Sequence, residues 1–317
     1  NIVYSDATKG WVPLEDDVTA LEPVAPNTQR AIFAYGNSGS VTNISNLVNS
    51  SGVVAADVSG VGTARAGLAA ATYGGDKAIF AFGSGYSNLS NLVTNQGVVG
   101  SDQTGVGTAR DYLAATSYGG DKAIFGYGNI YSGGYVIYSL KNLVSNSGVV
   151  ASDVTGVGTA RRELSATTYG GDKGMFAYGN SGGATMVSLK NLISNTGVVA
   201  ADVSGVGTAR NLLAAATYGE DKSIFAYGQS SGGNVSMSNL VSNSGVIAAD
   251  VSGVGTARRA PSGSGYGGDK GVFAYGYSSA NVSMSNLVSN SGVIAADVSG
   301  VGTGRAGVAA AGYSTSA

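Results

Sequence analysis

A six-fold internal repeat constrains the fold of this chain more than any other feature. A short apolar segment ending in an aromatic residue and a glycine returns six times. So does the block Gly-Val-Gly-Thr-Ala-Arg, in which Gly replaces Ala in the last copy. A repeated Asn always stands 19 residues before this Arg, as Asn46 does before Arg65. The Arg always stands 15 residues before the next Phe, as Arg65 does before Phe80. Such a period indicates one supersecondary unit repeated along the chain.

Variation in repeat length falls in one place, between the Gly after the aromatic residue and the next Asn. Insertions are tolerated where the backbone runs over the surface of a protein. We therefore expect one exposed variable loop in every repeat.

Each repeat also predicts four short strands. The second repeat has small apolar residues at 68–73, then a Gly-Gly-Asp-Lys turn, an unbroken apolar run at 78–82 and a third strand at 91–94. The fourth strand corresponds to residues 53–58 of the first repeat, after a turn whose Gly can adopt a positive φ. A helical repeat is disfavoured because the Ala-rich pieces are too short. The pattern predicts an all-β fold, a six-bladed β-propeller of four-stranded antiparallel blades.

The two ends of the chain predict how the ring closes. In the first repeat, residues 25–30 stand where the small apolar strand and its turn are expected. The chain ends with that missing piece, residues 305–313. We therefore expect a C-terminal strand to pair with the N-terminal blade and close the ring, which would leave no terminal repeat to cap.

Residues 1–28 differ from the repeats. They hold three of the four prolines, an acidic run at 15–17 and the only tryptophan, Trp11. We predict an extended N-terminal linker or the end of a preceding domain here, with Trp11 as an anchor on the propeller or on a partner. Residues 29–317 form the predicted propeller.

Composition excludes several classes of function. The chain contains no Cys and no His, which removes disulfides, thiolate metal sites and the usual general base. Charged residues are 11% of the chain and the net charge is −2, so no basic field favours nucleic acid or an anionic membrane. No apolar run is long enough to span a bilayer. We predict no cofactor, no metal site, no nucleic-acid binding and no membrane insertion.

The order of the repeated pieces resembles the kelch repeat of β-propellers: an Arg, a small-residue strand, a turn, an apolar strand ending in Gly, and two outer strands. The resemblance covers about residues 30–317. The Gly-rich repeats are also similar in style to repeat modules of tailed-virus (phage) structural proteins. The kelch resemblance implies that the variable loop joins the second and third strands of each blade and that all six loops emerge on one face. The likeness to phage modules implies that the chain belongs to a virion or another extracellular assembly.

An Asp recurs eight residues before each repeat Arg. A binding site that is needed once has no reason to occur six times, so we interpret these residues as structural ion pairs that tie strand ends or neighbouring blades together. The residues concerned are Asp57, Arg65, Asp102, Arg110, Asp153, Arg161, Asp202, Arg210, Asp250, Arg258, Asp297 and Arg305.

The variable loops carry the candidate binding residues. Tyrosine on Gly- and Ser-rich loops gives a large contact area at low entropic cost, and it also suits stacking on sugars. The third loop, residues 129–138, is the longest and most aromatic. The candidate binding residues are Tyr86, Tyr131, Tyr135, Tyr138 and Tyr277.

These observations favour a structural or interaction module, and not an enzyme, that presents its loop face to a protein or glycan partner within a larger particle. The first alternative is a carbohydrate-binding, lectin-like propeller. The second is a glycosidase-type enzyme, which needs two exposed carboxylates facing each other across a pocket, roughly 5–10 Å apart.

Overall fold

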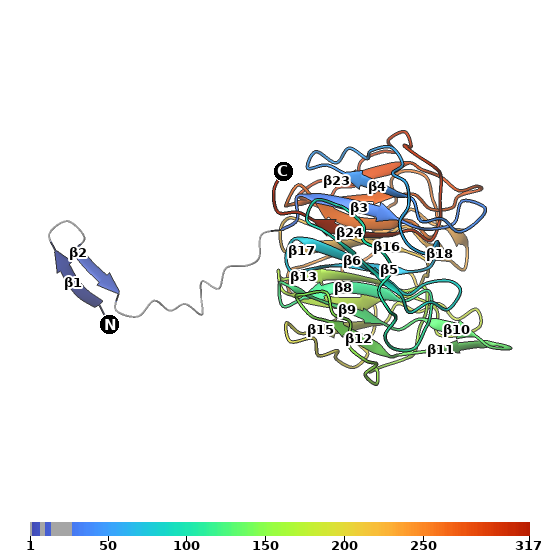
Figure 1. Cartoon of the computed structure of the whole chain (residues 1–317), viewed down its shortest axis with the longest axis horizontal. Helices are drawn as coiled ribbons and strands as arrows, with labels where there is room; N and C mark the ends of the chain where they lie inside the picture. The colour runs from blue at the N-terminus through green and yellow to red at the C-terminus, as the bar shows by residue number, and fades with distance from the viewer. Residues whose placement is uncertain (1, 7–9, 14–26) are drawn as a thin grey trace.

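The chain is all-β. The computed structural model describes residues 2–6, 10–13 and 27–317, with side chains from residue 27 onward (Figure 1). These residues form strands and turns and no helix, as the repeats predicted. None of the described residues therefore belongs to a helix long and apolar enough to cross a membrane.

Six three-stranded antiparallel sheets repeat along the chain, each with an inner, a middle and an outer strand. The inner strands are β24 (Ala309–Tyr313), β5 (Ala69–Tyr73), β8 (Ala114–Tyr118), β13 (Ser165–Tyr169), β16 (Ala214–Tyr218) and β21 (Ser262–Tyr266). The middle strands are β3 (Arg30–Ala34), β6 (Lys77–Ala81), β9 (Lys122–Gly126), β14 (Lys173–Ala177), β17 (Lys222–Ala226) and β22 (Lys270–Ala274). The outer strands are β4 (Ser45–Val48), β7 (Ser90–Val93), β12 (Lys141–Val144), β15 (Lys190–Ile193), β20 (Ser238–Val241) and β23 (Ser285–Val288).

Three two-stranded pairs complete the strands. Two of them lie inside variable loops: β10 (Asn129–Tyr131) with β11 (Tyr135–Ile137), and β18 (Gln229–Ser230) with β19 (Gly233–Asn234). The third, β1 (Ile2–Asp6) with β2 (Gly10–Pro13), lies near the N-terminus.

Burial along the strands follows from residue size. In the inner strand β5, buried and half-buried residues alternate, and Ala70 and Thr72 line the centre of the molecule. The middle strand β6 is buried from Ala78 onward because neighbouring sheets cover both of its faces. Its Phe80 packs against Tyr35 of the preceding sheet, with ring centroids 5.4 Å apart. Small residues near the centre and large ones further out fill the wedge between sheets.

The predicted fourth strand is not continuous, which corrects the expectation of four-stranded blades. In the first repeat, residues 53–58 make only two isolated bridges to β4. Between these bridges the carbonyl of Ala55 accepts a hydrogen bond from Nδ2 of Asn46 instead of from a backbone amide. The same side-chain bond recurs in every repeat, so it interrupts the ladder each time.

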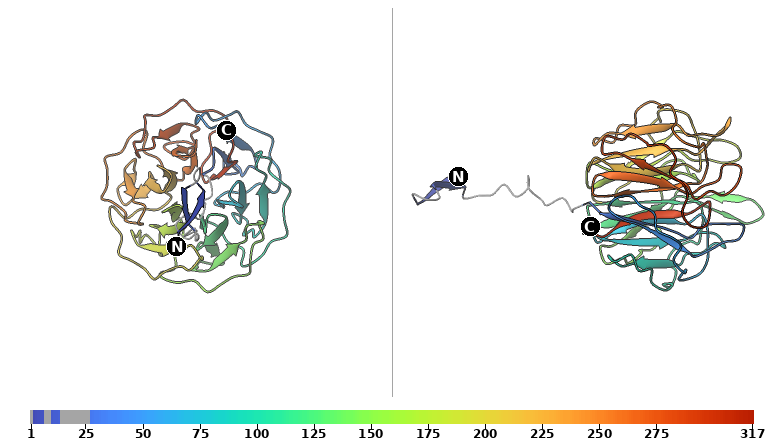
Figure 2. Two further views of the ribbon diagram at one scale, coloured as in Figure 1. Left: turned by 90° about the vertical axis from the view of Figure 1, so that its left-hand side faces the viewer. Right: turned by 90° about the horizontal axis from the view of Figure 1, so that it is seen from above.

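The inner strands lie side by side around a common centre (Figure 2, left). They contact each other in the order β5, β8, β13, β16, β21 and β24, and β24 in turn contacts β5. Along its length β24 pairs with β3, from Ala309 opposite Ala34 to Tyr313 opposite Arg30. The C-terminal strand thus completes the N-terminal sheet, as the missing piece in the sequence predicted.

Residues 27–29 join the sheets at the end opposite the variable loops. The amide of Gly268 donates to the carbonyl of Thr28 at 3.2 Å. Nδ2 of Asn27 donates to the carbonyl of Glu220 at 3.0 Å. The predicted domain boundary after residue 28 falls within this segment and stays a prediction.

The predicted anchoring role of the Trp11 side chain falls outside what the structure describes. The β1–β2 hairpin is a regular element within the segment predicted to be an extended linker or the end of a preceding domain.

Candidate functional site

Six fully buried arginines join successive repeats. Arg65 has no exposed surface, and its guanidinium lies 4.6 Å from the ring centroid of Tyr35 in its own repeat. Its Nη2 donates at 2.5 Å to Oδ1 of Asn91, and its Nε donates at 2.8 Å to the carbonyl of Phe82. Both acceptors belong to the next sheet. The arginine therefore stacks on one sheet and hydrogen-bonds to the next.

The Asp partner of each arginine lies in the following repeat. Oδ1 of Asp102 is 3.7 Å from Nη1 of Arg65. The same carboxylate accepts from Nδ2 of Asn91 and from the amide and hydroxyl of Thr63. The Gly-Val-Gly-Thr-Ala-Arg segment of one repeat is thereby held on the outer part of the next sheet.

All six predicted ion pairs are present with this offset, at N–O distances from 3.4 to 3.9 Å. They are Arg65–Asp102, Arg110–Asp153, Arg161–Asp202, Arg210–Asp250, Arg258–Asp297 and Arg305–Asp57. The last pair joins the C-terminal repeat to the N-terminal repeat. Because every one of these arginines is 0% exposed, no ligand can touch it without displacing the sheets. Their purely structural role stays a prediction, and this burial supports it.

Burial and hydrogen bonding shift the pKa values of these groups. Burial lowers the pKa of Arg110 to about 10, against an opposing effect of Asp153, so the guanidinium stays charged at neutral pH. Burial would raise the pKa of Asp57, but hydrogen bonds from Thr303 and Asn46 outweigh it and hold that pKa below its usual value. Both partners of each pair are therefore ionised at neutral pH.

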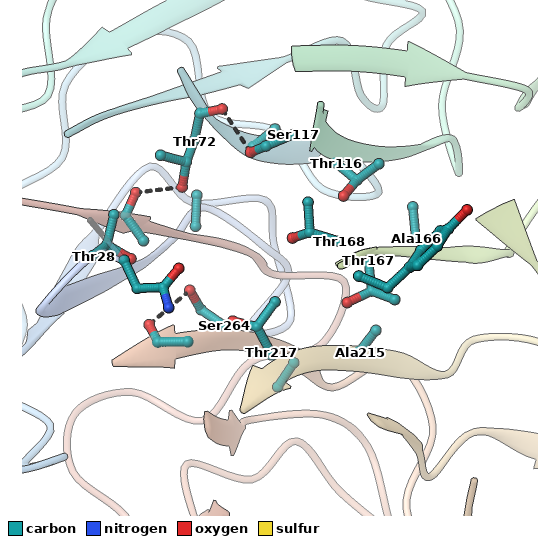
Figure 3. Close-up of a pocket in the computed structure, with 18 of the residues that line it drawn as sticks. Thr28, Thr72, Thr116, Ser117, Ala166, Thr167, Thr168, Ala215, Thr217 and Ser264 are labelled. Atoms are coloured by element: carbon teal, nitrogen blue, oxygen red, sulfur yellow. Dashed lines mark hydrogen bonds between the residues drawn. The ribbon is translucent and has the colours of Figure 1, made fainter. Parts of the chain in front are cut away.

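A narrow channel lies between the inner strands. At the end that carries residues 27–29 it holds a cavity of about 150 Å³ with a wall of small residues (Figure 3). Two hydroxyls in this wall are already in use, since Thr72 donates to the carbonyl of Gly312 and Ser117 to that of Thr72, both at 2.8 Å. A second cavity of about 120 Å³ occupies the loop end. Both are smaller than the roughly 300 Å³ at which ligand pockets usually begin.

A ring of six backbone hydrogen bonds surrounds the channel at the loop end. Each donor is the amide two residues after the repeat Arg, and each acceptor is the carbonyl of the equivalent residue in the preceding sheet. The bonds, donor first, are Tyr112–Gly67, Glu163–Tyr112, Leu212–Glu163, Ala260–Leu212, Gly307–Ala260 and Gly67–Gly307. All six residues have φ between 50° and 63°, a region that non-glycine residues rarely adopt and that clusters at functional sites.

The two positions after the repeat Arg break the symmetry of this ring. They read Ala66-Gly67, Asp111-Tyr112, Arg162-Glu163, Asn211-Leu212, Arg259-Ala260 and Ala306-Gly307. Apart from Arg259, the charged and amide side chains fall in three neighbouring sheets, and small residues occupy the rest. These residues were not among the candidates from the sequence, although a signal is visible there: a dipeptide that differs between repeats follows a nearly invariant block.

We call Asp111, Tyr112, Arg162, Glu163 and Asn211 the mouth cluster. Nη1 of Arg162 is 3.8 Å from Oε1 of Glu163, and Oε2 of the same carboxylate accepts from Nδ2 of Asn211 at 2.5 Å. Burial raises the pKa of Asp111 to about 6, with Arg162 opposing this rise and Glu163 adding to it. The Asp111 carboxylate is therefore poorly compensated by its surroundings.

The long third loop forms the hairpin β10–β11 beside the mouth cluster (green, lower right in Figure 1). Its Tyr131 and Tyr135 are 54% and 58% exposed, and their ring centroids are 5.3 Å apart. The guanidinium of Arg162 lies 3.7 Å from the ring centroid of Tyr135. The structure therefore brings two of the five predicted tyrosines next to the mouth cluster.

The other three predicted tyrosines belong to three different loops. Tyr86 is 41% exposed in the second loop. Tyr138 and Tyr277 are half-buried, and the guanidinium of Arg259 lies 4.8 Å from the ring centroid of Tyr277. These three residues do not form a single cluster with the hairpin tyrosines.

The carboxylates of the site bear on the metal and glycosidase hypotheses. Within residues 27–317, no group of three or more acidic side chains is placed to hold a metal ion. Asp111 and Glu163 are the carboxylates of the mouth cluster, and neither lines either of the channel cavities.

Comparisons with known proteins bear on the fold. No protein-family model matches the sequence, and no curated protein is significantly similar to it. In three dimensions the chain is similar to the solved structure of YjhT, a propeller-type fold, with a TM-score of 0.58. The two share 12% sequence identity over 78% of this chain and 87% of that chain. At this identity the likeness concerns the fold alone, and the repeated small sheets fit a β-propeller.

Proposed function

We propose that this chain is a closed six-bladed β-propeller of kelch-like type that works as a non-catalytic interaction module. Its loop face recognises a protein partner. The observation that carries this proposal is where the symmetry breaks: the mouth cluster and the exposed tyrosines of β10–β11 gather at the same end of the same sheets.

Three contacts across the chain ends support closure of the ring. β24 pairs with β3 along five residues. Nη2 of Arg305 donates to Oδ1 of Asn46 at 2.7 Å, and the amide of Gly67 donates to the carbonyl of Gly307 at 3.1 Å. Each of these contacts also occurs within or between the other sheets, so the first and last repeats meet as ordinary neighbours.

The opposite face is less suited to specific recognition. Its Gly-Gly-Asp-Lys turns repeat with little change and present ion pairs such as Lys173–Asp172, at 3.1 Å and with side chains 45% and 35% exposed. Exposed pairs of this kind contribute little binding energy. Residues 27–29 also enter there, so this face carries the connection to the N-terminal segment.

Tyr131 and Tyr135 suit a protein partner because exposed aromatic side chains with few rotatable bonds dominate protein interfaces. A virion or another extracellular assembly is the setting that the repeat style favours. Carbohydrate binding through the same exposed rings is the second candidate function, and a glycan array separates it from protein recognition.

Site-specific photo-crosslinking tests which face is used. The full chain carries a photoreactive phenylalanine either at position 131 on the loop face or at exposed position 96 on the turn face. Each variant is made in its native host and irradiated in the intact assembly. We expect position 131 to give one discrete cross-linked protein, and the change Tyr135→Ser to weaken that product.

A discrete product from position 96 with none from position 131 would place recognition on the turn face and overturn the proposal. Binding to glycans on the array, with no protein product from position 131, would favour the carbohydrate alternative.

A further inference from the structure

Several buried acceptor atoms have no hydrogen-bond partner among the described residues, and three of them lie in or beside the mouth cluster. They are the Oδ1 atoms of Asp111, Asn129 and Asn211, whose residues are 9%, 1% and 5% exposed. An acceptor that is removed from water without a partner costs free energy, and native proteins keep few such atoms. These three acceptors outnumber Nε of Arg162, a donor of the mouth cluster that also has no partner, so the described residues of this region accept more hydrogen bonds than they donate.

These three side chains belong to one site. Asp111 and Asn129 exchange backbone hydrogen bonds in both directions at 3.0 Å. Asn211 is connected through Glu163, whose carboxylate accepts from its Nδ2 and whose amide donates to the carbonyl of Tyr112. The acceptors therefore lie in the sheets of β8 and β16, and Glu163 of the sheet of β13 connects them.

The site also lacks positive charge. Asp111 and Glu163 contribute two negative charges and Arg162 one positive charge, which leaves a net charge of −1. The guanidinium of Arg162 is paired with Glu163 at 3.8 Å. Asp111 forms no ion pair with any of the residues that the structure describes.

One ligand chemistry supplies both missing features. A primary ammonium group carries one positive charge and three N–H donors, and it accepts nothing. A carboxylate or phosphate would add negative charge and no donors, and a hydroxyl would leave the charge uncompensated. The ring of Tyr112, which is 37% exposed, and that of Tyr135 add aromatic faces that attract a cation.

The hairpin β10–β11 provides a cover that can move. Its strands form a ladder only with each other, and its backbone is tied to the sheet of β8 at Asn129, which exchanges two hydrogen bonds with Asp111. Tyr135 lies over Arg162 at the edge of the mouth cluster. Exposed side chains change rotamer within nanoseconds, so Tyr135 can turn away from Arg162 without disturbing the sheets.

We propose that the mouth cluster, together with Asn129, binds a primary ammonium group from a lysine of the protein partner or from an amino sugar. This inference rests on the proposed function only in that the loop face is the recognition face.

A titration followed by amide NMR tests this inference on the full chain. The probes are Nα-acetyl-lysine methylamide and glucosamine, and their controls are the Nε-acetylated lysine derivative and N-acetylglucosamine, which lack the charge. We expect at least one amine to shift the signals of Asp111, Tyr112 and Asn211, and its acetylated control to bind about tenfold more weakly or less. The stronger of the two amines identifies the source of the ammonium group.

Matched variants assign the effect to the site. Asp111→Ala and Asn211→Ala should each weaken amine binding about tenfold, the loss expected for one hydrogen bond to a charged group. Asn37→Ala is the control, because Asn37 is the equivalent of Asn129 in the first repeat, where small residues follow the Arg. Melting temperatures of all variants verify that they fold.

Equal binding of the acetylated controls, or no signal change at the mouth cluster at saturating amine, overturns the inference. If the cross-link from position 131 persists in that case, the proposed function stands without the ammonium site. If that cross-link is lost while amine binding persists, the ammonium site stands and the proposal of a protein partner is overturned.

Discussion

Nη2 of Arg305 donates a hydrogen bond to Oδ1 of Asn46 at 2.7 Å, although 259 residues separate them along the chain. The guanidinium of Arg305 lies 4.4 Å from the ring centroid of Tyr275 in its own repeat. The same geometry joins Arg161 to Asn191 in the middle of the chain, at 2.5 Å. The junction between the chain ends therefore uses the contacts of an internal junction.

Replacing a repeat arginine should destabilise the protein strongly. Arg161→Ala leaves Asn191 and Asp202 without their buried partner, a change that costs about 3–5 kcal/mol in comparable sites. Arg305→Ala should cost about as much, because the same contacts are lost at the chain ends. Thermal or urea unfolding of the full chain measures both.

Lys173→Ala is the matched control, since Lys173 is 45% exposed in its ion pair and should change stability by less than about 0.5 kcal/mol. An Arg161→Ala variant with unchanged melting and impaired partner binding would show that these arginines serve recognition instead of structure.

Acid should weaken all six junctions over the same range of pH. The pKa of Asp57 is lowered in the folded protein because hydrogen bonds from Thr303 and Asn46 outweigh the effect of burial, and the other five junction carboxylates are shifted the same way. A lowered folded-state pKa gives stability that is present above the unfolded value and lost as pH falls through the folded value. The junction carboxylates alone should leave the melting temperature unchanged from pH 7 to 5 and make it fall steeply below about pH 4. Asp111, whose pKa is raised, should add a small rise between pH 7 and 5. A steady decline between pH 7 and 5 would contradict this.

Asp111→Asn should stabilise the protein at neutral pH. The pKa of Asp111 is raised by burial to about 6, so the folded state disfavours the ionised form. The penalty is full above about pH 6, shrinks as pH falls towards the unfolded value near 4, and vanishes below it. We expect a gain of about 1–2 kcal/mol at pH 7.5, allowing for water at the rim, and none near pH 4. A gain that does not depend on pH would exclude relief of a buried charge as its cause.

The scaffold was largely predictable because its determinants are local and repeated. The unbroken apolar run around Phe80 predicted a strand covered on both faces, and the displaced piece after Arg305 predicted the pairing of β24 with β3. The prediction of a continuous fourth strand was wrong, because the side chain of Asn46 donates to the carbonyl of Ala55 where a backbone amide would donate in a regular strand. Neither strand propensity nor the spacing of residues along the chain shows that a side chain will replace a backbone donor.

The candidate site was predictable only in part. Tyr131 and Tyr135 stood out by composition, but their proximity to Arg162 depends on how two loops meet in space. The offset that pairs Arg65 with Asp102 instead of Asp57 depends on packing between sheets, which spacing along the chain does not report.

The sheet of β21 is predicted to be the softest of the six. Its inner strand reads Ser262-Gly-Ser-Gly-Tyr266, and glycine weakens a strand interior. Pro261 itself precedes the strand, and β21 pairs with β22 along all five residues, so the strand is complete. Amide exchange of Gly263 and Gly265 should be faster than exchange at the equivalent Ala215 and Thr217 of β16. Equal protection would contradict this.

Closure of the ring is the premise of both proposals, and amide hydrogen exchange at the chain ends tests it most directly. If the six sheets form one closed ring, the amides of residues 310–313 and of Gly67 and Gly307 should be as strongly protected as those of the equivalent residues in β8 and of Tyr112 and Glu163. Exchange of the C-terminal strand at the rate of a free terminus, with slow exchange in the other five inner strands, would show that the ring is open and would contradict the account.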